Sequence, residues 1–175
     1  MKKLFYIIIL FSLLTSLIIF FYFNEIIILN FPKTSLKKEL LETAQRKTLN
    51  LFFWKDNRWH KDEIYVLWSK NINQNIFQII NNWLSLIDEE QIINRKISLQ
   101  SSSVENSTLY LSFDNNPFSE DFSTHKKLMI IESLLKTLRE SKIEINQIYF
   151  LAHHEVIEDA HLDFSNAWPI NGFLS

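Results

Sequence analysis

Hydrophobic positions divide the chain into an apolar N-terminal stretch and a longer patterned region. Residues 4–23, LFYIIILFSLLTSLIIFFYF, contain no charged side chain. From residue 48 onward, apolar side chains recur every two residues, as in half-buried strands, or every three to four, as in amphipathic helices. The pattern therefore predicts an apolar segment followed by one folded domain at residues 48–175.

The first part of this domain is predicted to hold two strands and a helix. Residues 49–55 and 63–69 are rich in the aromatic and branched side chains that favour strands, and the polar residues 56–63 between them indicate a turn. A helix is expected at residues 72–88, because its apolar residues return to one face. That face contains Ile72, Ile76, Ile79, Ile80, Trp83, Leu84 and Ile87.

The second part is predicted to repeat this order. Residues 96–101 and 107–113 alternate as strands around a hairpin turn, and residues 123–141 form a second amphipathic helix. Residues 146–157 return as a strand, with residues 160–165 as its partner. The inner face of the second helix is expected to hold Leu128, Ile131, Leu135 and Leu138. Its outer face is expected to hold Lys126, Lys127, Arg139 and Glu140.

The predicted order β-β-α-β-β-α-β-β indicates the fold class. Strands interleaved with two helices favour a small α+β sandwich in which both helices pack on a sheet. Large aromatic side chains contribute most to a core of this size. Those expected in the core are Trp54, Trp68, Trp83, Phe113 and Tyr149.

The apolar segment is long enough to cross a membrane as a helix. Twenty residues at 1.5 Å each span the roughly 30 Å hydrocarbon core of a bilayer. The alternative is a cleaved signal peptide, but its apolar core is only about 7–15 residues long and is followed by small residues. Bulky side chains follow here. We therefore expect an uncleaved transmembrane signal anchor at residues 1–23, with residues 4–23 in the bacterial membrane, and a stalk at residues 24–47.

Charges on the two flanks set the expected orientation. Lys2 and Lys3 precede the segment and Lys33, Lys37 and Lys38 follow it, so simple counting nearly balances. The very short N-terminal tail ahead of a signal-like segment favours a cytoplasmic N-terminus. The expected location is the cell membrane, with a single pass and the C-terminal domain outside the cytoplasm.

Composition excludes several functional classes. The formal net charge of −2 provides no basic excess for binding nucleic acid. The chain has no cysteine, so disulfides, thiolate catalysis and a lipidated N-terminal cysteine are all excluded. Its single glycine, Gly172, excludes the glycine-rich loops that bind phosphate.

The stretch YFLAHHEVIEDAHLDFSNAW, residues 149–168, concentrates the candidate chemistry. Its candidate metal ligands are His153, Glu155, His161 and Asp163. If the hairpin turns near residues 158–159, these four side chains converge on one polar face, where imidazole and carboxylate groups can bind zinc or a similar ion. The HEVIE segment departs from the helical zinc-protease motif, because it ends in Glu158 instead of histidine.

The simpler interpretation is that the four polar side chains solvate the outer face of a half-buried hairpin. No serine lies in a nucleophile elbow, and there is no cysteine to activate. On this interpretation the chain has no catalytic, cofactor-binding or metal-binding residue, and it needs no cofactor.

Several segments of the domain resemble the GerMN domain family, which occurs in sporulation, spore-germination and other bacterial envelope proteins. The matching segments are residues 49–54 (LNLFFW), 109–113 (LYLSF), 137–138 (TL), 145–151 (INQIYFL) and 160–165 (AHLDFS). Each is short, and their order across residues 49–170 carries the resemblance. The chain departs from the family where Ala160 replaces a usual glycine and where His153, His154 and Glu155 replace the usual turn.

The resemblance implies a non-catalytic domain similar to the ring-building modules of envelope assemblies. The first hypothesis is therefore a membrane-anchored interaction or scaffold domain that binds an envelope protein, a second copy of itself or peptidoglycan. The second is a metal-dependent or cell-wall-glycan-directed enzyme that uses the cluster at residues 153–163. Neither hypothesis involves nucleic acid.

Overall fold

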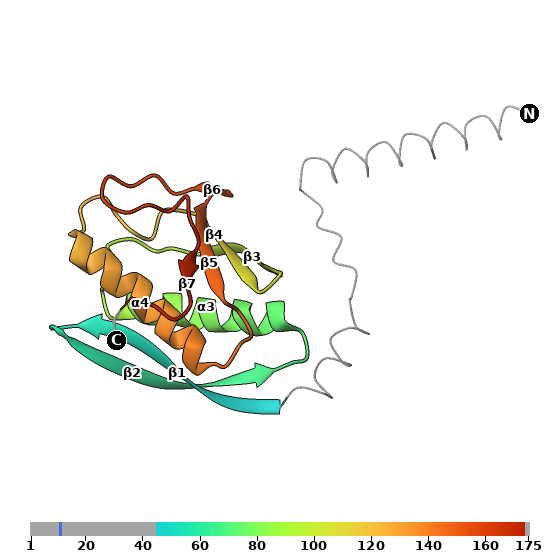
Figure 1. The fold of residues 1–175 in the computed structure, drawn as a ribbon. Helices are drawn as coiled ribbons and strands as arrows, with labels where there is room; N and C mark the ends of the chain where they lie inside the picture. Colours follow the sequence, from blue (N-terminus) through green and yellow to red (C-terminus); the bar gives the residue numbers. More distant parts are fainter. Residues whose placement is uncertain (1–10, 12–44, 174–175) are drawn as a thin grey trace, which may run out of the picture. The chain divides into compact units, whose positions relative to one another are not determined.

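Two helices lie between two β-sheets (Figure 1). The computed structural model describes residue 11 and residues 45–173. Residue 11 apart, the anchor predicted at residues 4–23 lies outside the described residues, as does the predicted stalk up to residue 44. No helix in the described part of the chain is long and apolar enough to cross a membrane.

The elements of the folded unit follow one another along the chain. They are β1 (Gln45–Lys55), β2 (Arg58–Trp68), α3 (Ile72–Glu89), β3 (Leu99–Glu105), β4 (Thr108–Phe113), α4 (Thr124–Glu140), β5 (Gln147–Ala152), β6 (Glu155–Val156) and β7 (Trp168–Pro169).

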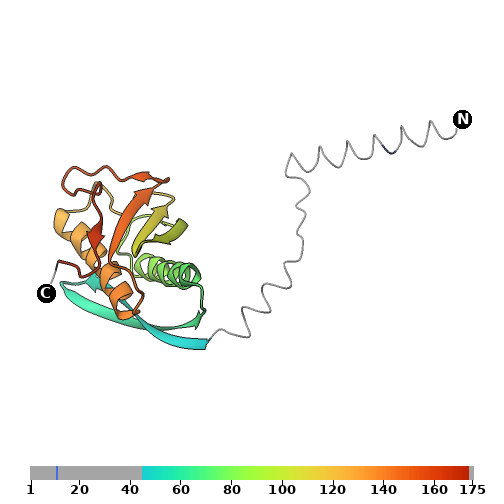
Figure 2. The ribbon, with the colours of Figure 1, turned by 45° about the vertical axis from the view of Figure 1, so that its right-hand side comes forward.

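The folded unit has three layers. The β1–β2 hairpin forms one outer layer, α3 and α4 form the middle layer, and a five-stranded sheet forms the other outer layer (Figure 2). In that sheet β3, β4, β5 and β6 are neighbours in this order, and β7 also pairs with β5. Strands β4 and β5 run parallel, so α4 is the crossover between them.

The prediction of an α+β domain with two helices is confirmed, but the predicted packing of both helices on one sheet is wrong. Ten of the seventeen residues of α4 are buried, which is more than one amphipathic stripe provides. A second sheet covers the side of the helix layer that was expected to face solvent. Lys127, also predicted on the outer face, is only 1% exposed because it pairs with Asp159 of the C-terminal loop.

Tight turns close three hairpins without a single glycine. Asp56 and Asn57 join β1 to β2, Asn106 and Ser107 join β3 to β4, and His153 and His154 join β5 to β6. All six residues have φ between 48° and 67°. Positive φ at both central positions is the geometry of a type I′ turn, which matches the twist of the paired strands. The hairpins are therefore longer and their turns shorter than the sequence predicts.

The strand boundaries change accordingly. The turn predicted at residues 56–63 contracts to two residues, because Arg58 already pairs with Lys55. Pairing continues to Gln45 opposite Trp68, so β1 begins four residues before the predicted strand at 49–55. Both predicted helices are confirmed, and their N-cap side chains, Asn71 and Ser123, accept hydrogen bonds from the first turn.

Helix side chains hold the hairpin in place by bonding its backbone at two points. At Phe52 of β1, the backbone N–H donates to Thr137 Oγ1 (2.9 Å), and the backbone oxygen accepts from Trp83 Nε1 (3.1 Å). At Leu67 of β2, the N–H donates to Gln78 Oε1 (3.3 Å), and the oxygen accepts from Gln78 Nε2 (2.9 Å). These bonds satisfy backbone groups that the two-stranded sheet leaves unpaired.

The core fills the space between the three layers. Leu49, Leu51 and Phe53 project from β1 toward the helices and are at most 6% exposed. Of the aromatic residues predicted to be buried, Trp83 and Phe113 are fully enclosed. The other three, Trp54, Trp68 and Tyr149, are only half-buried. A second aromatic group, formed by Phe118, Phe150 and Phe164 with ring centroids 5.0–6.2 Å apart, packs the C-terminal loop against the five-stranded sheet.

The C-terminal residues are held by a charged pair on α4. Arg139 Nη2 donates to Glu132 Oε1 (2.5 Å), and Arg139 Nη1 donates to the backbone oxygen of Ile170 (2.8 Å). Glu132 Oε2 accepts from the N–H of Phe173 (3.2 Å). Gly172 lies directly against this pair with φ of 74°, and a Cβ atom there would lie 2.4 Å from Glu132 Oε2. A side chain at this position would therefore be strained and would displace the ion pair, so the only glycine of the chain lies where glycine fits best.

Replacing this glycine is expected to destabilise the protein. In Gly172→Ala, the left-handed backbone and the displaced ion pair together should cost roughly 2–4 kcal/mol in the free energy of unfolding, measured by urea denaturation. The matched control is Asn171→Ala, an exposed neighbour that should change this free energy by less than about 0.5 kcal/mol. Equal effects of the two substitutions would contradict the close packing at Gly172.

Candidate functional site

His153 and His154 form the turn between β5 and β6 and are not strand residues. The N–H of His153 donates to the backbone oxygen of Phe113, and the N–H of His154 donates to Ser112 Oγ, both at 2.9 Å. Both imidazole side chains are exposed. The prediction of a turn near residues 158–159 is therefore wrong, because the hairpin closes earlier. The strand pairing that would place the four candidate ligands on one face therefore does not form.

The remaining candidates lie along an irregular loop. Glu155 begins the two-residue strand β6 and is exposed, as is His161. The strand predicted at residues 160–165 does not form. Asp163 is bound within its own turn, where its carboxylate accepts from the N–H (2.8 Å) and Oγ (2.5 Å) of Ser165 and from Asn166 Nδ2 (2.8 Å). The hydrogen bonds from Ser165 and Asn166 lower the pKa of Asp163.

The geometry gives the metal-dependent hypothesis no support. In residues 45–173, no group of three or more His, Asp or Glu side chains is arranged to hold a metal ion. The donors His153, Glu155, His161 and Asp163 are spread over a turn, a short strand and a loop, and Asp163 already accepts three hydrogen bonds.

The same loop instead contains a buried ion pair that the sequence pattern does not predict. Lys127 Nζ donates to Asp159 Oδ2, and both side chains are at most 2% exposed. Asp159 Oδ1 also accepts from the N–H groups of His161 (2.9 Å) and Leu162 (3.0 Å). Burial alone would raise the pKa of Asp159, but the bonds from Lys127 and the two N–H groups outweigh it and lower the pKa.

The ion pair forms the floor of an open cavity of about 450 Å³. The other lining residues are Glu120, Glu158, Ala160 and His161. The helix pattern places Lys127 in solvent because this residue lies beside the apolar stripe of its helix. Asp159 forms an Asx turn with the N–H groups of His161 and Leu162, and this turn holds its carboxylate in place for Lys127. The carboxylate on the cavity floor is neutralised by Lys127 and is not free to bind a cation.

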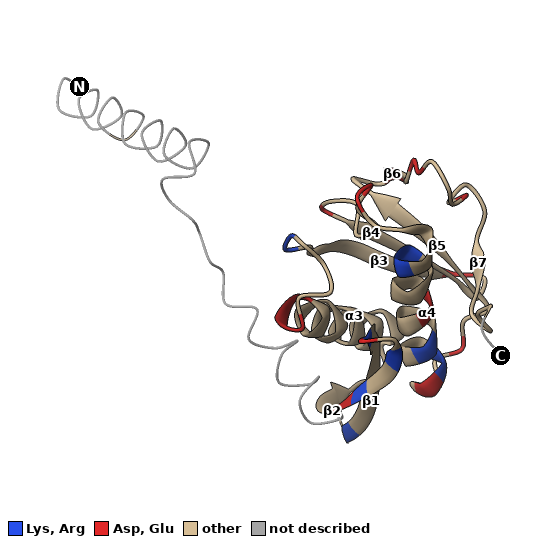
Figure 3. Ribbon diagram, turned by 90° about the vertical axis from the view of Figure 1, so that its left-hand side faces the viewer, with Lys and Arg blue, Asp and Glu red and all other residues tan. Residues whose placement is uncertain are grey.

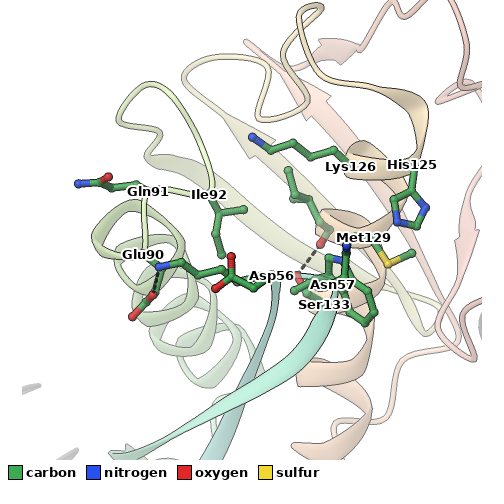
Figure 4. A pocket seen from close by; sticks show the side chains of 12 residues that line it. Asp56, Asn57, Glu90, Gln91, Ile92, His125, Lys126, Met129 and Ser133 are labelled. Carbon is green, nitrogen blue, oxygen red and sulfur yellow. Dashed lines mark hydrogen bonds and ion pairs between the residues drawn. The ribbon is translucent and has the colours of Figure 1, made fainter.

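A second cavity lies where the β1–β2 turn meets the end of α3 and the start of α4 (Figure 4). Its volume is about 330 Å³, and Trp54, Ile92, Met129 and Ile130 are among the residues that line it. At its rim Lys55 Nζ contacts Glu90 Oε2 at 2.7 Å.

Two polar groups of this second cavity, on Lys126 and Ser133, are engaged in contacts within the fold. Lys126 Nζ lies 3.7 Å from the centre of the Phe122 ring, and burial lowers the pKa of Lys126. Ser133 Oγ donates to the backbone oxygen of Ile130 (2.7 Å), so its hydroxyl is engaged within the helix. The cavity offers an apolar space with a cation at its edge.

Breaking the buried ion pair is expected to be costly. Asp159→Asn keeps an acceptor for the two N–H groups but leaves Lys127 charged and unpaired. The free energy of unfolding should fall by about 3–5 kcal/mol, measured by urea denaturation at pH 7. The double variant Lys127→Met/Asp159→Asn removes both charges and should recover part of this loss. A double variant no more stable than Asp159→Asn would contradict the ion-pair explanation.

The same pair predicts a pH dependence with a definite sign. The pKa of Asp159 is lower in the folded state than in the unfolded chain, so its stabilising contribution is complete above the unfolded value of about 4. The contribution is lost as pH falls through the lower, folded pKa. Thermal unfolding between pH 6 and pH 2 should therefore show a smaller acid-induced loss of stability in Asp159→Asn than in the unmodified chain.

Comparisons with known proteins find similarity at the level of the fold. No family model and no curated protein matches the chain. Among solved structures, a presumed lipoprotein from Clostridium perfringens is similar, with 14% identity and a TM-score of 0.49 over 74% of this chain and 90% of that one. The tandem GerMN domains of the sporulation protein GerM from Bacillus subtilis are similar with 10% identity and a TM-score of 0.45.

The GerM similarity covers 74% of this chain and 46% of the other, so this chain spans about half of the tandem structure. At these identities the similarity concerns the fold, and the chemistry of the chain follows from its own residues.

Proposed function

We propose that this chain is a membrane-tethered domain that works outside the cytoplasm by binding other molecules and catalyses no reaction. Residues 4–23 provide the tether, since they are uncharged and long enough for a bilayer. The folded unit that begins at β1 provides the binding function. Its compartment follows from the orientation expected for a short N-terminal tail carrying Lys2 and Lys3.

The observation that carries the non-catalytic assignment is the use of carboxylates as structural acceptors. Asp159 pairs with Lys127, and Glu132 pairs with Arg139. Asp114 accepts from the N–H (2.8 Å) and the hydroxyl of Ser98. A general acid or base needs a carboxylate or imidazole free to exchange a proton with a substrate, and these carboxylates are already committed to holding the fold.

The histidines do not form a nucleophile–base pair. His60 is stacked on Phe53 with ring centroids 5.1 Å apart, and its Nε2 accepts from Arg58 Nε (3.1 Å). His154 Nδ1 lies 3.5 Å from Ser101 Oγ, but both groups are exposed and the contact is at the limit of a hydrogen bond. This pair lacks the short bond and the orienting third group that activate a serine.

The binding partner is proposed as a component of the bacterial envelope. The candidates are an envelope protein, a second copy of this chain and peptidoglycan. Sedimentation of the full chain with purified cell-wall sacculi, compared with chemical cross-linking in intact cells, distinguishes the glycan from the two protein partners.

The proposed compartment leads to a test of topology. A reporter enzyme that is active only outside the cytoplasm, fused after Ser175, should be active in cells. Replacing Lys2 and Lys3 with glutamate reverses the N-terminal charge and should reduce that activity. If this reporter is inactive and a second reporter, active only in the cytoplasm, is active at the same position, the proposed compartment is contradicted.

The proposal that the chain uses no metal leads to a second test. The purified full chain should contain no stoichiometric metal by elemental analysis, and its melting temperature should not change in EDTA. The matched variant is His161→Ala/Asp163→Ala, which removes two exposed candidate ligands. Stoichiometric metal that disappears in this variant would support the enzyme hypothesis instead.

A further inference from the structure

The solvent-facing side of the β1–β2 hairpin is unusually aromatic. Side chains directly opposite each other in an antiparallel pair lie on the same face of the sheet. The face that points away from the helices is therefore formed by the pairs Arg46–Leu67, Thr48–Tyr65, Asn50–Glu63, Phe52–Lys61 and Trp54–Trp59. We call this set the hairpin outer face. It presents Phe52, Trp54 and Trp59, which are half-buried, and Tyr65 and Leu67, which are 75% and 44% exposed.

Positive charge is interleaved with these aromatic side chains. Arg46 and Lys61 belong to the hairpin outer face, and Lys136 reaches it from α4, with Nζ 4.7 Å from the ring centre of Phe52 and 4.8 Å from that of Trp59. Basic residues are spread along the hairpin and α4 in the charge-coloured view (Figure 3). One carboxylate, Glu63, lies on the same face. The face therefore combines amphipathic aromatic rings with an excess of cations.

The hairpin outer face also lies at the point where the N-terminal segment joins the fold. Arg46 pairs with Leu67, and Thr48 pairs with Tyr65, so the two most exposed apolar side chains of this face are beside the first residues of β1. Only twenty-one residues, 24–44, separate β1 from the uncharged segment 4–23. Fully extended, they reach no more than about 75 Å. Any membrane that holds residues 4–23 is thus within reach of this face.

We infer that the hairpin outer face binds the surface of an anionic lipid bilayer. The inference rests on the proposed tether and adds a second membrane contact. Tryptophan and tyrosine are favoured at the lipid–water interface, where the ring is buried and its polar group stays hydrated. Arginine and lysine beside them pair with anionic headgroups. Because Thr137, Trp83 and Gln78 hold the hairpin backbone, the face is ordered before it meets lipid.

The test uses the absence of cysteine in the chain. Tyr65→Cys in the full chain is labelled with an environment-sensitive fluorophore and reconstituted in vesicles of phosphatidylcholine, with or without phosphatidylglycerol. A blue shift and increased intensity are expected only with phosphatidylglycerol. Ser103→Cys is the matched control, since Ser103 is exposed on β3 in the opposite layer, and it should show no shift.

A charge reversal tests the electrostatic part. Arg46→Glu/Lys61→Glu should lower the equilibrium constant for binding of the domain to the lipid surface by roughly 30-fold or more. Each basic residue near an anionic surface strengthens this binding, and each glutamate in its place is repelled. The matched control, Arg95→Glu/Lys96→Glu, makes the same change in net charge at two exposed residues of the loop before β3 and should leave the Tyr65→Cys signal unchanged.

The outcomes separate this inference from the proposed tether. Chain that resists alkaline extraction from vesicles, yet shows equal signals at residues 65 and 103, overturns the lipid contact and leaves the tether standing. Chain that is extracted but still shows the shift with phosphatidylglycerol retains the contact and overturns the tether. A shift that is independent of lipid charge and grows with the protein-to-lipid ratio means that a second copy covers the face, which also overturns the inference.

Discussion

Helix α4 lies between two sheets and has charged side chains that are buried or partly buried. The C-terminal part of the chain provides hydrogen-bonding and ionic partners for these side chains. A charge removed from water is tolerated only when it is paired and hydrogen-bonded. Asp159 meets Lys127 near the start of the helix, while Ile170 and Phe173 bond the pair formed by Arg139 and Glu132 near its end. The loop between these points has little regular structure, yet its path is set at both ends by α4.

The two outer layers depend on the same helices in different ways. The five-stranded sheet is joined to them by apolar packing, as with Leu109, Leu111 and Phe150, which are fully buried. The hairpin uses packing from Leu49 to Phe53 on one face, together with side-chain bonds to its backbone at Phe52 and Leu67. An isolated two-stranded hairpin is marginally stable in water. Its attachment to the helices leaves its other face available for binding.

Local periodicity predicted both helices and most strand positions, because helix and strand patterns differ clearly over ten or more residues. It did not predict the three two-residue turns, since turn position depends on which residues pair across strands, and pairing is a non-local property. His153 and His154 show the consequence. An alternating pattern continues through them, but their positive φ ends the strand and sends the candidate ligands in different directions. Periodicity did not predict the buried Lys127 for a related reason, because its partner Asp159 lies 32 residues later in the chain and a helix pattern carries no information on such long-range pairs.

These features also bear on how the folded unit can sit near a membrane. The twenty-one residues 24–44 cannot span more than about 75 Å, so a membrane that held residues 4–23 would keep the folded unit close to its surface. A tethered contact needs little intrinsic affinity, because the tether raises the local concentration of lipid surface. The hairpin outer face and the five-stranded sheet are opposite layers (Figure 1). A hairpin that lies on lipid would turn β3, β4 and β5 away from the membrane, toward the space where an envelope partner would be met.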